Sequence, residues 1–301
     1  MAGDVASGAG VRFGPAGWSY PDWKARAYPR RLDEHPLSFL ARYVDTVEVN
    51  TTFYQPVAAA TSRRWVALVA GEPRFRFTVK LWRGFTHADE PVGVAAAAEF
   101  RAGLEPLRAA GLLGAVLAQF PWSFRRSPLA MRRLEEVCRA FASDNLVVEF
   151  RHGSWDVPHT LAFLSECGVG FCNVDQPLFS DSLGPTEHLT AGTAYVRLHG
   201  RNREAWFDPG ATRDTRYDYL YSLSELKPWA DTIARLARRA ETVYVVTNNH
   251  FRASALVNAL ELRSLVTGET PSAPPCLRAA YPRLGGLTRE LSSCQPSLFP
   301  V

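Results

Sequence analysis

LVVEFRH, at residues 146–152, is the stretch of this 301-residue chain that decides its fold. It is a short apolar run that ends in three ionisable side chains, Glu149, Arg151 and His152. Seven other apolar runs have the same form, and most end in polar or ionisable residues: 12–14, 44–50, 75–81, 114–120, 170–175, 194–199 and 242–249. In a (β/α)8 barrel the carboxyl ends of all the strands face one shared site. The pattern therefore predicts both a fold and a place for the chemistry.

Helical stretches alternate with these runs. We expect helices over residues 32–43, 61–69 with Thr61 as cap, 94–110, 128–142 after Ser127, 157–167 with Asp156 as cap, 223–240 and 254–266. After the sixth run, over residues 176–192, a helix is weak or missing. Strands that alternate with helices imply parallel strands joined by crossovers. The sequence predicts an α/β fold, a single-domain (β/α)8 TIM barrel over residues 11–266, between a disordered N-terminus (1–10) and a flexible Pro-rich tail (267–301).

A doubly wound open sheet is the alternative architecture, but no Gly-rich phosphate loop follows any of the strands. Hydrophobic residues make up 47% of the chain, and no apolar run approaches the roughly 18 residues that a membrane span needs. The N-terminus lacks the features of a signal peptide, so we expect a soluble, cytoplasmic protein without a membrane partner. The net charge of +4 permits an anionic ligand but does not demand one.

Charged side chains at the strand ends are the candidates for chemistry. Because strand residues alternate between two faces, Glu149 and Arg151 point the same way, as do Arg197 and His199. Burying an unpaired charge in the helix layer is costly, so these pairs should face the barrel axis near its mouth. There they act as acid/base groups or form an ion-pair network that only plugs the barrel. The candidate catalytic residues are Glu48, Glu149, His152, Asp175 and His199.

Cations, amides and aromatic residues crowd the same strand ends and predict a site for an anionic, phosphate-bearing ligand. The candidate ligand-binding residues are Trp18, Tyr20, Asn50, Tyr54, Lys80, His87, Gln119, Arg151, Trp155, Arg197, Arg201, Asn248 and Asn249. The imidazole and carboxylate groups could instead hold a divalent metal such as Zn or Mn, although the interleaved cations would repel it. The long segment 201–221, rich in Arg and aromatic residues, is typical of a lid or a binding loop.

The same strand ends resemble those of a known family. GWSYPDW (17–23), VEVNTTFY (47–54), FTVKLWRGFTH (77–87), QFPWSF (119–124), VEFRHGSW (148–155), YVRLHGR (195–201) and NNH (248–250) are similar to the YecE-like family, domain of unknown function 72. The resemblance covers about residues 11–266 and implies a TIM barrel. It implies no activity, because the family has no settled one. The chain departs from the pattern at Thr247, where an aromatic residue is expected.

The end of the chain, QPSLF, has the form Q-x-x-L-F and resembles the peptide with which bacterial DNA enzymes dock on the replication sliding clamp. Gln295, Leu298 and Phe299 would make that contact. This tail favours a phosphoester or nucleic-acid hydrolase linked to DNA repair. The alternatives are an isomerase, lyase or hydrolase of a small sugar-like or sugar-phosphate substrate, and a non-catalytic DNA-associated protein. A closed pocket would favour the small substrate, and an open basic groove would favour nucleic acid.

Overall fold

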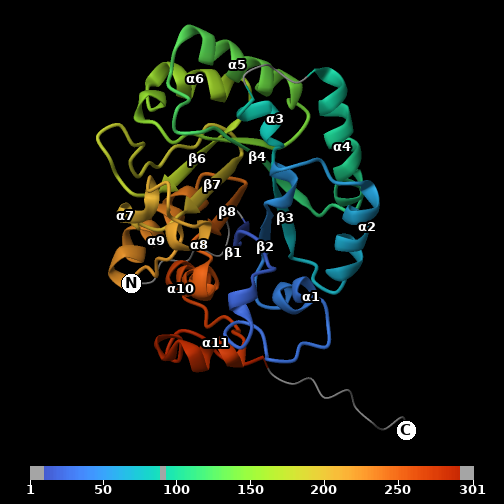
Figure 1. Ribbon diagram of the computed structural model, residues 1–301, viewed down its shortest axis with the longest axis vertical. Coiled ribbons are helices and arrows are strands. Elements are labelled where there is room, and N and C mark those ends of the chain that lie inside the picture. Colours follow the sequence, from blue (N-terminus) through green and yellow to red (C-terminus); the bar gives the residue numbers. More distant parts are fainter. Residues whose placement is uncertain (1–9, 89–92, 292–301) are drawn as a thin grey trace.

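Eight parallel strands form one sheet that closes on itself. The computed structural model describes residues 10–88 and 93–291, and Figure 1 shows their arrangement. The strands are β1 (Gly10–Pro15), β2 (Thr46–Val49), β3 (Arg76–Lys80), β4 (Leu113–Gln119), β5 (Leu146–Glu149), β6 (Gly170–Asp175), β7 (Thr193–Leu198) and β8 (Thr242–Thr247). Their order is β1-β8-β7-β6-β5-β4-β3-β2. Hydrogen bonds from Asp45 N to Phe13 O (3.0 Å) and from Gly17 N to Glu48 O (2.9 Å) join β1 to the β2 side. The predicted (β/α)8 TIM barrel is confirmed.

The larger helices lie outside the strands, and the short ones lie in the connections (Figure 1). They are α1 (Pro36–Ala41), α2 (Ala59–Leu68), α3 (Arg83–Thr86), α4 (Val94–Ala109), α5 (Pro128–Ala140), α6 (Pro158–Glu166), α7 (Arg203–Trp206), α8 (Arg213–Arg216), α9 (Leu223–Ala237), α10 (Ser254–Thr267) and α11 (Pro275–Ala280). Short 3-10 turns are η1 (Pro21–Trp23), η2 (Thr51–Phe53), η3 (Gly153–Trp155), η4 (Phe251–Ala253) and η5 (Pro282–Leu284). Between β6 and β7 there is no helix, as the sequence indicated. The connection after β7 instead carries α7 and α8.

Three helices begin elsewhere than expected. The stretch 32–43 forms only the short α1, because Pro36 lacks an amide hydrogen and is tolerated only in the first turn of a helix. Thr61 lies inside α2, which begins two residues earlier. Asp156 does not cap α6, because its carboxylate accepts a hydrogen bond from His188 Nε2 at 2.7 Å instead. Proline thus shortened α1, and a contact from a distant part of the chain removed the expected cap of α6.

The strands are buried on both faces. Every residue of β2, β5, β6 and β7 is buried, because helices cover the outer face and packed side chains fill the barrel. The barrel is tight at the seam between β1 and β2. A Cβ added to Gly14 would lie 1.7 Å from the carbonyl oxygen of Thr46, so only glycine allows the two backbones to approach this closely.

The segment 268–291, expected to belong to a flexible tail, is folded against the barrel. α11 and η5 bury Leu277 and Leu284 completely. Arg283 donates to Glu261 Oε1 and Oε2, each at 2.6 Å. The barrel therefore includes a C-terminal segment whose apolar positions are too few to be recognised as a helix in the sequence.

The Q-x-x-L-F segment with Gln295, Leu298 and Phe299 lies outside the described residues, as does the N-terminal stretch 1–9. Among the described helices, none is both long enough and apolar enough to cross a membrane.

Candidate functional site

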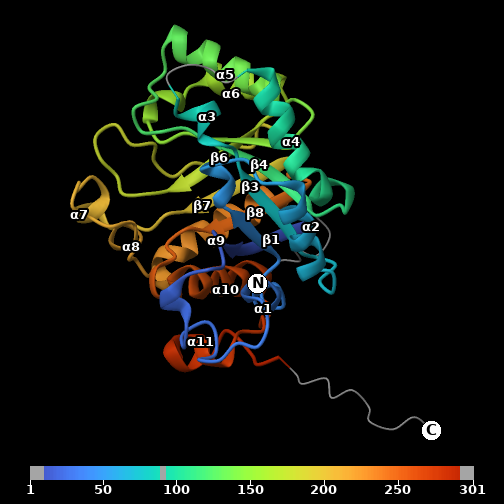
Figure 2. The same cartoon turned by 45° about the vertical axis from the view of Figure 1, so that its right-hand side comes forward.

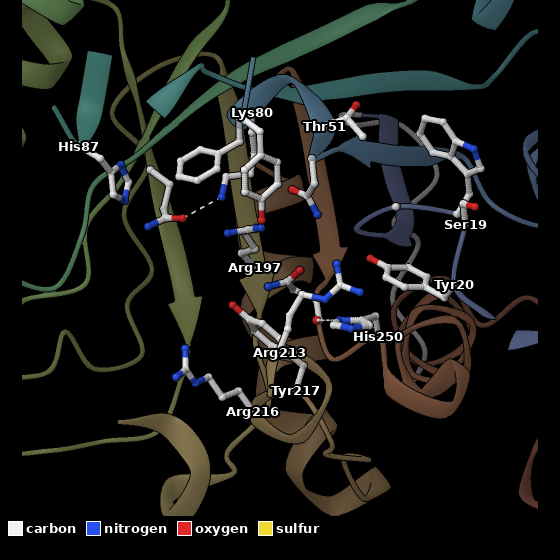
Figure 3. A pocket seen from close by; sticks show the side chains of 17 residues that line it. Ser19, Tyr20, Thr51, Lys80, His87, Arg197, Arg213, Arg216, Tyr217 and His250 are labelled. Carbon is white, nitrogen blue, oxygen red and sulfur yellow. Dashed lines mark hydrogen bonds between the residues drawn. The ribbon is translucent and has the colours of Figure 1, made fainter. Parts of the chain in front are cut away.

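A cavity of about 690 Å³ lies at the carboxyl ends of the strands (Figure 3). Residues that end or directly follow β1, β2, β3, β4, β7 and β8 form most of its wall, and the segment 201–221 adds the rest. The lining residues are Gly17, Trp18, Ser19, Tyr20, Asn50, Thr51, Phe53, Tyr54, Lys80, His87, Gln119, Arg197, Arg213, Arg216, Tyr217, Asn248 and His250. The site thus lies where the polar strand ends predicted it.

Arg197 on β7 lies at the centre of the cavity floor. Its side chain is 1% exposed, Nη1 donates to Glu149 Oε2 at 2.9 Å, and Nη2 donates to Glu48 Oε1 at 2.5 Å. The Tyr195 hydroxyl donates to Glu48 Oε2 at 2.9 Å. Burial alone would raise the pKa of Glu149, but Arg151, Arg197 and His199 outweigh it and hold that pKa well below its ordinary value. Glu149 is therefore ionised, and both glutamates pair with Arg197 beneath the cavity.

Glu149, on β5, also contacts two further side chains, Arg151 and His199. Arg151 Nε lies 2.6 Å from Glu149 Oε1, and His199 Nε2 lies 3.3 Å from the same oxygen. Burial, followed by the positive charge of Arg151, lowers the pKa of His199 well below its ordinary value. A neutral His199 can accept at Nδ1 from Asn248 Nδ2 (3.0 Å), while its Nε2 faces Glu149. Trp206 of α7 lies over Arg151 and His199, with its ring 5.7 Å from the guanidinium carbon and 6.3 Å from the imidazole.

Lys80, the last residue of β3, reaches the cavity from the side opposite the 201–221 segment. Its Nζ donates to Gln119 Oε1 at 2.8 Å and lies 4.1 Å from the centre of the Phe53 ring. Burial, and then the neighbouring Arg197, lowers the pKa of Lys80 to about 7. His87 lies beside it (Figure 3), and burial, followed by Lys80, lowers the pKa of His87 to about 4. At neutral pH the wall therefore offers a neutral imidazole and an amine near its titration midpoint.

The opposite wall is built from η1, β8 and α8. The Tyr20 ring stacks on His250 at 4.4 Å and 17°. His250 Nε2 is 3.1 Å from Asp214 Oδ1, and Tyr217 lies 5.4 Å from the His250 ring. Arg213 lies over the outer face of Tyr20 at 5.6 Å. These contacts hold α8 against the barrel and place its arginines at the rim (Figure 3).

Asp175, at the end of β6, anchors the segment 201–221. Its Oδ1 accepts from Arg201 Nε (2.9 Å) and the Tyr221 hydroxyl (2.6 Å). Its Oδ2 accepts from Arg201 Nη2 (2.7 Å) and Trp229 Nε1 (2.6 Å). Asn249 Nδ2 donates to the Tyr219 carbonyl at 2.8 Å. Asp175 therefore anchors the two ends of the segment, while α8 in its middle is held by Tyr20 and His250. In Figure 2, α7 lies at the left-hand edge of the molecule.

The structure brings together many of the predicted ligand-binding residues. Those that line the cavity are Trp18, Tyr20, Asn50, Tyr54, Lys80, His87, Gln119, Arg197 and Asn248. Other candidates lie beneath or beside the cavity: Glu48, Glu149, Arg151, His199, Asp175, Arg201 and Asn249. Glu48 and Glu149 have the geometry of the ion-pair network weighed as their alternative role, and neither is exposed.

Two candidates, His152 and Trp155, do not line the cavity. His152 Nδ1 accepts from Ser154 N at 3.1 Å, and its ring packs against Trp122 at 5.4 Å. Trp155, expected to bind ligand, is a core residue, which corrects that expectation. It is fully buried, stacks on Phe150 at 4.5 Å and donates from Nε1 to a backbone carbonyl. The sequence alone does not show which way an aromatic residue directly after a strand points. Its side chain can face the mouth of the barrel or pack beneath the outer helices.

Sequence reasoning left several lining residues out of the candidate site. They are Gly17, Ser19, Thr51, Phe53, Arg213, Arg216, Tyr217 and His250. The signal for Arg213, Arg216 and Tyr217 was the Arg- and aromatic-rich composition of the 201–221 segment. Their positions depend on how that segment folds back over the barrel. The alternation of apolar and polar residues in the strands carries no information about this fold.

The described residues contain no group of three His, Cys, Asp or Glu side chains arranged to hold a metal ion. The carboxylates nearest the cavity, those of Glu48 and Glu149, pair with Arg197. The cysteines 138, 167, 172 and 276 are free thiols, and Cys167 is exposed.

Comparison with known proteins places this arrangement in a wider group. A family model described as "Protein of unknown function DUF72" matches residues 12–280. The UPF0759 protein YunF of Bacillus subtilis (strain 168) is 26% identical over 279 residues, which are 88% of this chain and 98% of that protein. The crystal structure of a DUF72 family protein from Thermotoga maritima MSB8 is 36% identical, with a TM-score of 0.76, over 85% of this chain and 99% of that one. A DUF72 family protein from Enterococcus faecalis V583 shares the fold at 23% identity and a TM-score of 0.75, over 85% of this chain and 95% of that one.

Proposed function

Because the chain belongs to the DUF72 family, whose description leaves its function open, we propose from the cavity that the protein is an enzyme for a small, anionic, sugar-like substrate. A sugar phosphate or a sugar acid has the required chemistry. The observation that carries the proposal is the lining of the cavity. It consists of cationic, amide and aromatic side chains, among others, and its described lining residues include no carboxylate.

The charge of the lining supports an anionic ligand. Lys80 and Arg197 contribute from the barrel, and Arg213 and Arg216 contribute from the rim. Arg197 is neutralised by its two glutamates, and Arg213 lies 3.5 Å from the Asp214 carboxylate. Arg216 forms no ion pair within the described part of the chain and adds an uncompensated charge at the rim. A guanidinium fork binds a phosphate or carboxylate through two parallel hydrogen bonds, which adds orientation to attraction.

The remaining lining suits a polyhydroxylated ligand. Asn50, Gln119 and Asn248 present amide groups that can both donate to and accept from hydroxyls. The Oδ1 atom of Asn50 is buried and has no hydrogen-bond partner within the described part of the chain, so a ligand hydroxyl would satisfy it. Trp18 and Tyr54 offer flat apolar faces of the kind that pack on sugar rings.

Lys80 is the candidate for proton transfer, because its pKa of about 7 lets the amine both accept and release a proton near neutral pH. His87, with a pKa of about 4, stays neutral there and can hydrogen-bond to a ligand. The role first assigned to Glu149 and His199 becomes that of a buried layer that fixes Arg197. The hydrolase and DNA-repair hypothesis rested on the Q-x-x-L-F tail, and an open basic groove would have favoured it. The cavity is instead walled by the strand ends and by the 201–221 segment, which favours a small substrate.

Calorimetry with a panel of sugar phosphates, sugar acids and neutral sugars tests the proposal. We expect at least one anionic member to bind with a Kd below about 1 mM, and the matching neutral sugar to bind at least tenfold more weakly (about 1.4 kcal/mol). Arg213→Ala with Arg216→Ala should lose about tenfold in affinity, whereas Arg132→Ala, an exposed arginine on α5, should bind as the unaltered protein does. Equal binding of neutral sugars, or tighter binding of oligonucleotides that sugar phosphates fail to displace, would refute it.

A further inference from the structure

Lysine is rare in this chain, and one of its few copies lies in the cavity. Of 34 Lys and Arg residues, only Lys24, Lys80 and Lys227 are lysines. Lys24 and Lys227 are exposed, whereas Lys80 is buried at 8% exposure. Arginine thus supplies nearly every positive charge of the molecule, except at the end of β3. An arginine there would hold an anion, but its guanidinium does not deprotonate in proteins, whereas an amine does.

The surroundings of Lys80 leave its nitrogen free to react. Gln119 accepts one of its N–H groups at 2.8 Å, which orients Nζ without protonating it. The carboxylates of Glu48 and Glu149 pair with Arg197 instead, and no carboxylate among the described residues forms an ion pair with Lys80. The backbone is also fixed, because Thr52 Oγ1 donates to the Lys80 carbonyl at 2.7 Å. Figure 3 shows the side chain directed into the cavity between His87 and Thr51.

We propose that Lys80 is the nucleophile of this site and forms an imine with the aldehyde or ketone carbonyl of an anionic substrate. The inference rests on the proposed function and narrows its substrate class to carbonyl compounds that carry a phosphate or carboxylate. The lowered pKa of Lys80, caused first by burial and then by Arg197, supports it, because only the neutral amine attacks a carbonyl.

The step balances without a cofactor or an oxidant. The Nζ lone pair adds to the carbonyl carbon, a C–N bond forms, and the π electrons move to oxygen. One N–H proton passes to that oxygen and gives a carbinolamine. A second proton, taken from water, allows the hydroxyl to leave as water and gives the protonated imine. Hydrolysis by one water molecule returns the free amine. The protonated imine withdraws electrons from the adjacent carbon, which suits isomerisation or the cleavage of a neighbouring carbon–carbon bond.

Reductive trapping tests the assignment on the full-length protein. The probes are pyridoxal 5′-phosphate, an aldehyde that carries a phosphate, and glyoxylate, a smaller anionic aldehyde, each with sodium cyanoborohydride. Peptide mass spectrometry measures the labelling rates of all three lysines from pH 5.5 to pH 10. We expect at least one probe to label Lys80 about tenfold faster than Lys24 and Lys227 at pH 7. Its labelling should be half-maximal near pH 7, whereas the two exposed lysines should react appreciably only at higher pH.

Two controls separate this inference from the proposed function. Lys80→Met should abolish the fast label while calorimetric binding of pyridoxal 5′-phosphate, without reductant, persists through the arginines. If the probes bind and are displaced by inorganic phosphate, but Lys80 is labelled no faster than Lys24, the imine is refuted and the anion site stands. If Lys80 is labelled fast but its labelling is half-maximal only above about pH 9, the claim that a lowered pKa activates Lys80 is refuted. If no anionic probe binds, the proposed function falls as well.

Discussion

Arg197 is the residue on which the buried charges of the barrel mouth depend. It bridges Glu48 and Glu149, and neither carboxylate reaches solvent. Removing one partner of a buried pair leaves an uncompensated charge in a region of low dielectric constant. Arg197→Met should therefore lower the free energy of unfolding by about 3 to 5 kcal/mol at pH 7, measured by urea denaturation.

A matched variant distinguishes this effect from a general loss of arginine. Arg132→Met, on the exposed face of α5, should change the free energy of unfolding by less than about 0.5 kcal/mol. A loss of under about 1 kcal/mol for Arg197→Met would contradict the view that the pair is fully desolvated.

Lys80 should destabilise the fold below its own pKa. Its pKa is about 7 in the folded protein against an ordinary 10.5, so between these values the unfolded chain binds more protons than the folded one. The stability of the unaltered protein therefore rises with pH across this window, and the penalty is fully present below about pH 7. Lys80→Met should be more stable than the unaltered protein by about 2 kcal/mol at pH 6, less at pH 8.5, and no more stable near pH 10.

Urea denaturation at the three pH values provides the measurement. Lys24→Met serves as control, because Lys24 is exposed and its substitution should give a difference that does not vary with pH. A constant difference between Lys80→Met and the unaltered protein would show that Lys80 keeps an ordinary pKa.

At the scale of elements, the segment 201–221 differs from the rest of the barrel because it is an extra stretch of chain between β7 and α9. Asp175 binds Arg201, Tyr221 and Trp229 and so ties both ends of the segment to β6 and α9. Asp175→Asn replaces one acceptor oxygen with a donor, and at least one of the four donors then loses its partner. Backbone amides between α7 and α8 should exchange hydrogen at least tenfold faster, with little change in β3 and β4. The hydrogen-exchange rates, followed by mass spectrometry, check this.

The control for this variant lies in the same connection after β6. Asp181→Asn changes a half-exposed carboxylate that pairs only loosely, with Arg125 at 3.7 Å and with His152 at 3.9 Å. Its exchange pattern should match that of the unaltered protein. Unchanged exchange in Asp175→Asn would mean that α8 is held by its contacts with Tyr20 and His250 alone.

The strands and the side of the barrel that carries the site could be predicted from sequence. Short apolar runs with polar ends have a local physical cause, because charge is tolerated only where a strand meets the mouth. How deeply each polar side chain lies within the mouth of the barrel could not be predicted. Glu149 and Lys80 end β5 and β3, the two strands that flank β4, in the same way, yet one is sealed by arginine and the other faces the cavity. That difference depends on partners from distant strands.

Helix boundaries and the rim were predicted less well, for a related reason. The proline at the start of α1 shortened that helix, and His188 took the carboxylate expected to cap α6. His250 and Arg213 reach the cavity only because α8 folds back onto η1 and β8. Such contacts join segments far apart in the chain, and a single sequence carries no periodic signal for them.

For the whole molecule, closure of the barrel depends on the seam between β1 and β2. Gly14 leaves no room for a side chain, since a Cβ would lie 1.7 Å from Thr46 O. Gly14→Ala must push the two strands apart and should lower the free energy of unfolding by at least about 3 kcal/mol, measured by urea denaturation. Gly71→Ala is the control, because nothing lies within 4 Å of its added Cβ. Comparable stability of the two variants would show that the seam yields easily.

The ion pairs of Arg197 with Glu48 and Glu149 beneath the cavity affect how ligand preference can change among related proteins. Because Glu48 and Glu149 cancel the charge of Arg197 inside the barrel, the balance of charge at the entrance is set mainly by Arg213 and Arg216, on a stretch of chain that folds outside the strands. Exchange of that stretch between homologous barrels would redirect ligand preference while the reactive wall at Lys80 stays in place. Chemistry and selectivity would then be inherited as separate modules, and libraries restricted to residues 202–218 would be the natural starting point for engineering new specificities.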